Sequence, residues 1–161
     1  MAKKNLESLP AVEQTLIPPI QEDPENKILE LDEMWTFVFK KDFKMWLWVA
    51  LSRETRQIVA YFLGDRSESS CRQLWEKVPE SYREGDCYTD CLNVYQEVIP
   101  AEQHFPCRKK DSETNHIERW FNTLRQRLAR VVRKTLSFSK SHTLCMKFVF
   151  SLLLFIITSL S

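Results

Sequence analysis

Hydrophobic and polar positions alternate first in residues 28–39, ILELDEMWTFVF, with the period of two that is typical of a β-strand. Residues 45–51, MWLWVAL, are apolar on both faces, as a central strand would be. Residues 57–63, QIVAYFL, give a third strand that ends at Gly64. Short polar segments separate the three runs, so the pattern predicts a three-stranded meander.

Asp32 is a charged residue inside the first predicted strand, on the same face as Met34 and Thr36. A buried charge is costly unless it is paired or bound to a metal ion. Asp32 is therefore a candidate ligand. The same strands contain three tryptophans, Trp35, Trp46 and Trp48. We expect these tryptophans to form the core of the meander; the alternative is an aromatic platform for nucleic acid.

Shorter elements follow the meander. Residues 67–78 have the apolar spacing of a helix. Residues 86–90, DCYTD, predict a short strand with Asp90 at its carboxyl end, and a helix is expected near residues 92–98. His104 and Phe105 then mark a fifth strand.

Residues 111–140 predict one long helix. Its apolar face consists of Ile117, Phe121, Leu124, Leu128 and Val131. Beside that face lie Glu118, Asn122 and Arg125, at helical spacing. The remaining surface is basic, with Arg119, Arg127, Arg130, Arg133 and Lys134. A carboxylate beside the apolar face of a basic helix has two interpretations: a phosphodiester site, or a solvated amphipathic helix. The helix alone does not decide between them. The phosphodiester site is favoured only if carboxylates from other elements lie near Glu118.

The predicted order is β-β-β-α-β-α-β-α, an α/β fold with a mixed sheet and the ribonuclease-H-like layout. This order places Asp32 on the first strand, Asp90 at the end of the fourth and Glu118 on the closing helix. Because sites in open α/β sheets gather near the carboxyl ends of strands, we expect the three to converge.

Three such carboxylates are suited to hold two divalent cations that promote phosphoryl transfer, and Mg²⁺ or Mn²⁺ prefers their oxygen ligands. We assign Asp32 as the bridging ligand, Asp90 to one ion and Glu118 to the other. Arg125, supported by Asn122, is expected to hold a phosphate near the metals. Taken singly, Asp90 could instead be a helix N-cap and Glu118 a solvated residue.

Charge is unevenly distributed along the 161 residues, although the net charge is only +1. Residues 108–140 hold ten Lys and Arg but three Asp and Glu, which indicates a polyanion partner for this region. Residues 1–27 are polar and rich in proline, and we interpret them as a mobile leader or linker. Residues 28–141 form the expected catalytic domain.

Five cysteines without CxxC spacing make a zinc site improbable and indicate a reducing compartment. Cys87 and Cys91 are expected to be core or strand-end thiols. The amino terminus lacks the apolar run of a signal peptide, so a cytoplasmic location is expected.

The segments LELDEMWTFV, CYTD and NHIERWFNTLRQRLARVVRKTLSFSKS resemble the transposases of the IS-one family of insertion sequences. The similarity runs from about residue 29 to residue 141. It implies a DDE-type acidic triad at Asp32, Asp90 and Glu118 and metal-dependent cleavage and joining of DNA strands. The implied partners are double-stranded DNA, both element ends and target, and a homo-oligomer or an assembly with full-length transposase.

Two departures from the family leave other functions open. The chain lacks the zinc finger and helix-turn-helix of the family's first reading frame, so it resembles the second frame alone. Residues 142–161 form an atypical apolar segment: residues 148–160 are nearly all apolar, but these 13 residues are short of the ~20 that span a bilayer. A buried helix and a frame-slip product both remain open. The alternative functions are a truncated, non-catalytic inhibitor of transposition and a related metal-dependent nuclease.

Overall fold

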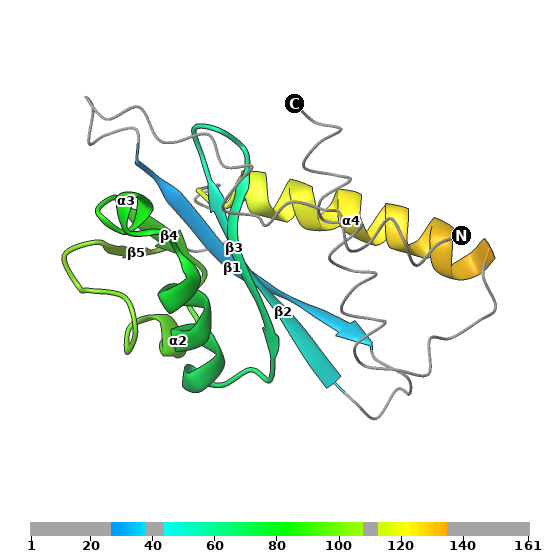
Figure 1. Cartoon of the computed structure of the whole chain (residues 1–161), viewed down its shortest axis with the longest axis horizontal. Helices are drawn as coiled ribbons and strands as arrows, with labels where there is room; N and C mark the ends of the chain where they lie inside the picture. Colours follow the sequence, from blue (N-terminus) through cyan, green and yellow to red (C-terminus); the bar gives the residue numbers. More distant parts are fainter. Residues whose placement is uncertain (1–26, 38–43, 108–112, 135–161) are drawn as a thin grey trace.

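A five-stranded mixed sheet forms the centre of the protein (Figure 1). The computed structural model describes residues 27–37, 44–107 and 113–134, with the side chains of residues 36, 37, 44 and 127–134 outside the description. The strands are β1 (Leu29–Phe37), β2 (Lys44–Ser52), β3 (Ile58–Gly64), β4 (Cys87–Thr89) and β5 (His104–Pro106). Their spatial order is β3-β2-β1-β4-β5. The predicted meander is antiparallel, whereas β4 and β5 add to it in parallel.

In the described ranges of the chain, four helical elements connect or cover these strands. They are α2 (Glu68–Lys77), α3 (Glu80–Arg83), the 3₁₀ helix η2 (Asn93–Tyr95) and α4 (Asn115–Lys134). The helix expected near residues 92–98 is a single 3₁₀ turn followed by further turns, because that short segment already buries Tyr95 and Ile99 before Pro100. The four-residue α3 was not predicted.

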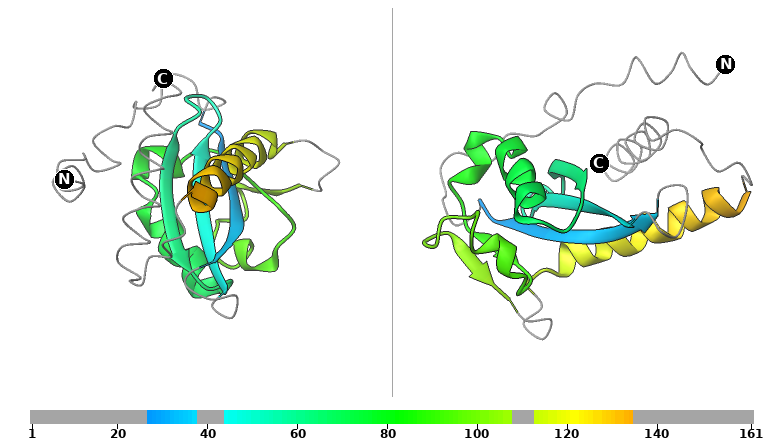
Figure 2. Two further views of the ribbon diagram at one scale, coloured as in Figure 1. Left: turned by 90° about the vertical axis from the view of Figure 1, so that its right-hand side faces the viewer. Right: turned by 90° about the horizontal axis from the view of Figure 1, so that it is seen from below.

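Helices cover both faces of the sheet, with β1 between the two layers (Figure 2). On one face, Cys71 and Leu74 of α2 pack into a core with Leu29, Leu31 and Trp48. On the other face, a second core is formed by Met34, Leu47, Val49, Leu51, Ile58, Ile117, Trp120, Phe121 and Leu124. The alternation of β1 thus directs odd-numbered residues toward α2 and even-numbered residues toward α4.

The apolar face predicted for the long helix is confirmed at its three described positions. Ile117 and Leu124 are fully buried, and Phe121 is nearly so. Trp120 adds to this face and was not foreseen. The side chains of Leu128 and Val131 lie outside the described residues, as does the part of the predicted helix beyond Lys134.

The three tryptophans have different environments. Trp48 is fully buried, stacks edge-on against Tyr95 and donates a hydrogen bond from Nε1 to the carbonyl oxygen of Asp65. Trp46 is partly buried. Trp35 is 39% exposed, so its prediction as a core residue is wrong.

The expectation of a core thiol is confirmed for Cys87. Cys71 and Cys87 are buried, and burial raises the pKa of each thiol to about 12. Cys91 is exposed and lies two residues beyond the end of β4. Apart from Lys27, the predicted leader and the whole C-terminal segment 142–161 lie outside the described residues. Among the described helices, none combines the length and hydrophobicity that crossing a bilayer requires.

Candidate active site

The parallel pairing of β1 with β4 brings two predicted aspartates together. Leu31 of β1 is in register with Thr89 of β4, so Asp32 and Asp90 follow side by side. A carboxylate oxygen from each of them, together with one from Glu33, lies within 4.8 Å of the others. β4 ends at Thr89, and Asp90 therefore occupies the carboxyl end of a strand, as expected.

Asp32 has an unusual protonation equilibrium. Burial, followed by the negative charges of Glu33, Asp90 and Glu118, raises its pKa from 3.8 to about 7. A hydrogen bond from the Glu33 amide to Asp32 Oδ1, 2.8 Å long, opposes that effect. Within the part of the chain that the structure describes, no Lys or Arg forms an ion pair with Asp32.

Glu33 is a third acid in this cluster, and the sequence analysis did not select it. It is nearly buried and points toward the α2 layer, where Tyr95 Oη donates to its Oε2 at 2.8 Å. Arg66 donates to Oε1 from Nε and Nη2, at 2.9 and 2.6 Å. Burial nevertheless raises the pKa of Glu33. Both oxygens thus already have strong donors, which favours a supporting role over that of a free ligand.

Asp90 is held by backbone and side-chain contacts around the end of β4. Its Oδ1 accepts a hydrogen bond from the Leu92 amide at 2.9 Å, which closes a local turn; η2 itself has no side-chain cap, so Asp90 is not the helix N-cap considered as its alternative role. The buried Thr89 hydroxyl donates to the Asp90 carbonyl oxygen at 2.7 Å and lies 2.8 Å from His104 Nε2. These contacts fix the backbone that carries the carboxylate.

Glu118 lies in the first turn of α4 and is exposed. Its negative charge contributes to the raised pKa of Asp32, so the two carboxylates interact. Glu118 is not part of the 4.8 Å carboxylate group. The structure therefore brings Asp32 and Asp90 into one cluster and leaves Glu118 as a nearby acid beside it.

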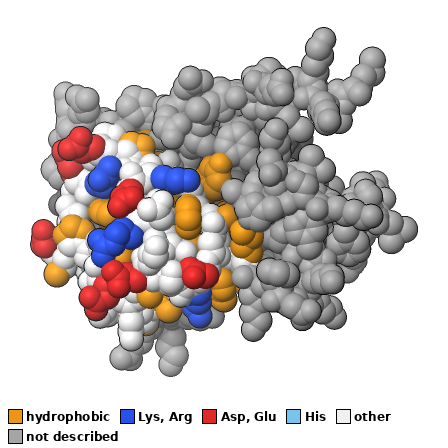
Figure 3. Space-filling model, turned by 60° about the horizontal axis from the view of Figure 1, so that its bottom comes forward, with side chains coloured by type: hydrophobic (Ala, Val, Ile, Leu, Met, Phe, Trp, Pro, Cys, Tyr) orange, Lys and Arg blue, Asp and Glu red, His pale blue; other side chains and the backbone are white. Residues whose placement is uncertain are grey.

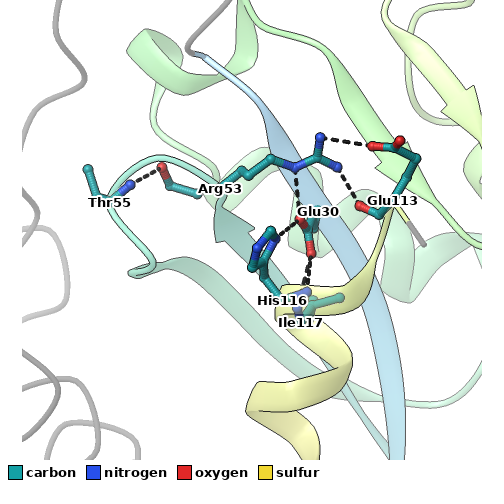
Figure 4. Close-up of polar contacts among 7 residues, drawn as sticks. Glu30, Arg53, Thr55, Glu113, His116 and Ile117 are labelled. Atoms are coloured by element: carbon teal, nitrogen blue, oxygen red, sulfur yellow. Dashed lines mark hydrogen bonds and ion pairs between the residues drawn. The ribbon is translucent and has the colours of Figure 1, made fainter.

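Glu30 is a further buried acid that the sequence analysis missed. Its carboxylate lies on the α4 face of β1 and contacts the first turn of α4 (Figure 4). The signal available in the sequence was the spacing of three acids, Glu30, Asp32 and Glu33, in a strand otherwise built of apolar residues. Only Asp32 was selected from that group.

The predicted DNA-binding residues are described only in part. Arg119, Asn122 and Arg125 are exposed, and Arg125 Nη1 donates to Asn122 Oδ1 at 3.1 Å. The side chains of Arg127, Arg130, Arg133 and Lys134 lie outside the described residues. On the surface shown in Figure 3, described basic side chains are interspersed with acidic ones.

The donor set of this cluster suits a hard divalent cation. Carboxylate oxygens are the ligands that Mg²⁺ and Mn²⁺ prefer, and a positive ion would stabilise the ionised form of Asp32, which burial and then the neighbouring acids disfavour.

Comparison with known proteins identifies relatives of the whole described region. A family model described as IS1 transposase matches residues 27–155. The iso-IS1n InsB protein of Shigella dysenteriae is 36% identical over 114 residues, which are 71% of this chain and 84% of that protein. InsB of an IS1 element of Shigella flexneri is 34% identical over 112 residues, 70% of this chain and 82% of that protein.

One similar solved structure is a chain of the simian T-cell lymphotropic virus intasome in complex with PP2A regulatory subunit B56 gamma. The TM-score is 0.61 at 14% sequence identity, and the match covers 85% of this chain and 50% of that one. At this identity the likeness concerns the fold alone. With the mixed sheet and the order of elements, it confirms the predicted ribonuclease-H-like fold.

Proposed function

The chain belongs to the IS1 transposase family, and on that premise we propose that Asp32, Asp90 and Glu118 are the acidic triad of this DDE-type transposase. The observation that carries the proposal is the meeting of Asp32 and Asp90 at neighbouring parallel strands, with carboxylate oxygens within 4.8 Å. The electrostatic effect of Glu118 on Asp32 supports it as the third member.

We infer that Asp32, Asp90 and Glu118 would together hold two Mg²⁺ or Mn²⁺ ions. Such ions supply Lewis-acid activation of the attacking oxygen and stabilise the leaving oxygen in phosphodiester chemistry. Asp32 contributes an anionic oxygen once its proton has left. Asp90 contributes a carboxylate whose Oδ1 is oriented by the Leu92 amide and whose backbone carbonyl is held by the Thr89 hydroxyl.

The substrate in this proposal is double-stranded DNA, both the ends of the element and the target. Arg119 and Arg125 on the exposed side of α4 would contact phosphates, as would Arg127, Arg130, Arg133 and Lys134 further along the helix. Phosphate contacts position a protein on DNA without reading its sequence. A homo-oligomer, or an assembly with a longer transposase, would then bring two DNA ends together.

Strand transfer by the purified chain tests the proposal. Pre-cut element ends are incubated with target DNA and Mg²⁺ or Mn²⁺, and Asp32→Asn, Asp90→Asn and Glu118→Gln are compared with wild type. Asp86→Asn is a matched control because Asp86 is exposed and lies outside the cluster. We expect each triad variant to lose cleavage and joining and the control to retain them.

Calorimetric titration with Mn²⁺ adds a readout that is independent of DNA. Metal binding by the wild type and its loss in Asp90→Asn support the proposed site even if the isolated chain requires a longer transposase for joining. A wild type that binds no Mn²⁺ and cuts no DNA would contradict the metal-dependent function and favour the inhibitor. Full activity in any one triad variant would remove that residue from the set.

A further inference from the structure

Glu30 is a fully buried carboxylate whose two oxygens both accept hydrogen bonds. Oε2 accepts from the backbone amides of His116 and Ile117, at 3.1 and 3.0 Å. Oε1 accepts from Arg53 Nε at 2.9 Å and faces His116 Nδ1 at 2.6 Å. Figure 4 shows these donors converging on the Glu30 carboxylate from α4 and from the loop that follows β2.

The contact functions as a helix cap supplied from a distant strand. The first amides of a helix have no partner within the helix, and a carboxylate there also interacts favourably with the helix dipole. Capping residues usually precede their helix directly in the sequence. Here the acceptor is 86 residues away from His116, so the cap joins α4 to β1 as well as completing the helix.

Arg53 extends the same connection to the segment before α4. Its Nη1 donates to Glu113 Oε2 at 3.0 Å, and its Nη2 donates to the Glu113 carbonyl oxygen. One guanidinium therefore bonds both the capping acid and the backbone leading into the helix. This arrangement compensates the buried charge of Glu30 and restricts where α4 can begin.

The position of the cap relates it to the proposed triad. Glu30 is two residues from Asp32 on the same face of β1, a separation of about 7 Å along a strand. Ile117, whose amide it accepts, directly precedes Glu118. The Glu30 carboxylate therefore ties the first turn of the helix that carries Glu118 to the strand that carries Asp32.

We propose that Glu30 is a positioning residue that sets the placement of Glu118 relative to Asp32. The inference rests on the proposed function of Glu118 as a ligand. Removal of the cap lets the first turn of α4 fray or shift, while Asp32 and Asp90 remain held by the pairing of β1 with β4. The effect on metal binding therefore passes through Glu118 alone.

A double-mutant cycle tests this coupling by calorimetric titration with Mn²⁺ of wild type, Glu30→Gln, Glu118→Gln and the double variant. We expect Glu30→Gln to weaken Mn²⁺ binding about tenfold or more, the size typical of groups that orient metal ligands. In the Glu118→Gln background the same change should have no further effect. Glu113→Gln is the matched control, because it alters the Arg53 network without touching the helix amides, and it should leave Mn²⁺ affinity unchanged.

Two further measurements keep the inference testable if Glu30→Gln destabilises the fold. His116→Ala removes only the ring contact with Oε1, keeps the backbone amide and should give a smaller weakening in the same cycle. In metal-free protein, hydrogen exchange of the His116 and Ile117 amides should accelerate in Glu30→Gln but not in Glu113→Gln.

The inference would be overturned if Glu30→Gln weakened Mn²⁺ binding by the same factor in the wild type and in the Glu118→Gln variant. Glu30 would then affect Mn²⁺ binding through the whole fold and not through Glu118. Unchanged Mn²⁺ affinity in both the Glu30 and His116 variants would also overturn it. Failure of the proposed function has a different signature: Asp32→Asn and Glu118→Gln would bind Mn²⁺ as the wild type does.

Discussion

Replacement of Asp32 by Asn should stabilise the metal-free protein while it abolishes the proposed metal site. In the unfolded chain Asp32 ionises near its ordinary pKa of 3.8, whereas in the folded protein its pKa is about 7. Between these pH values the folded state binds more protons than the unfolded state. The free energy of unfolding therefore falls as pH rises from about 4 to 7 and levels off above that.

The size of the effect follows from the pKa difference. A change from 3.8 to about 7 is roughly 3 pH units, and at about 1.4 kcal/mol per unit this corresponds to an upper value of roughly 4 kcal/mol at pH 8. Solvent reaching the partly exposed carboxylate reduces that value, so about 2 kcal/mol is the expected gain for Asp32→Asn. The Asn side chain can still accept the Glu33 amide hydrogen bond, so no native contact of that kind is lost.

Urea unfolding in the presence of EDTA at pH 5, 6, 7 and 8 measures this gain. The stability difference between Asp32→Asn and wild type should widen up to pH 7 and then stay constant, while Asp86→Asn follows the wild type. Mn²⁺ should reverse the order: at a hundredfold excess over its dissociation constant it adds about 2.7 kcal/mol to the wild type and nothing to the variant. A variant less stable than wild type at pH 8 without metal would refute the electrostatic reasoning.

Three further substitutions probe the framework around the site by urea unfolding, with the slope of the transition as a check on two-state behaviour. Leu124→Ala, in the fully buried contact of α4, should cost about 2–5 kcal/mol. Ser67→Ala removes the side chain that caps α2 by accepting from the Ser70 amide and should cost about 1 kcal/mol. Gly85→Ala would place Cβ 1.6 Å from the Lys27 carbonyl oxygen and should cost about 2 kcal/mol or more; an unchanged midpoint would mean that this close approach relaxes freely.

The strands and the long helix were predictable because their apolar residues repeat with a clear period. β2 is apolar on both faces and lies inside the sheet, and Ile117, Phe121 and Leu124 mark the buried side of α4. The helix expected near residues 92–98 was less predictable. A single 3₁₀ turn at Asn93–Tyr95 already buries Tyr95, so the apolar pattern of this segment does not require a longer helix. The exposure of Trp35 depends on which layer covers its position, and no local pattern reports that.

The site residues that the order and the ends of the strands place together could be predicted from the sequence. Those whose roles depend on contacts with residues far along the chain could not. Asp32 and Asp90 follow from the order of strands. Glu30 and Glu33 acquire their roles from residues far along the chain: Arg53 lies 23 residues from Glu30, and Tyr95 lies 62 residues from Glu33. A sequence pattern shows that these acids are unusual in a strand but does not show what they bind.

The three acids of β1 differ in how their negative charge is compensated. This difference distinguishes Glu30 and Glu33, which have structural roles, from Asp32, the proposed metal ligand. In the described part of the chain, Glu30 and Glu33 each have an arginine at salt-bridge distance, whereas Asp32 has none. Strand alternation explains the arrangement, since Glu30 meets the start of α4 and Glu33 meets the opposite layer. Asp32 is left buried among acidic neighbours; burial first, and then their negative charge, raises its pKa, and this destabilises the metal-free fold. A lower stability of the metal-free protein is expected where a buried carboxylate functions as a ligand for a bound cation and not as the partner of a basic side chain.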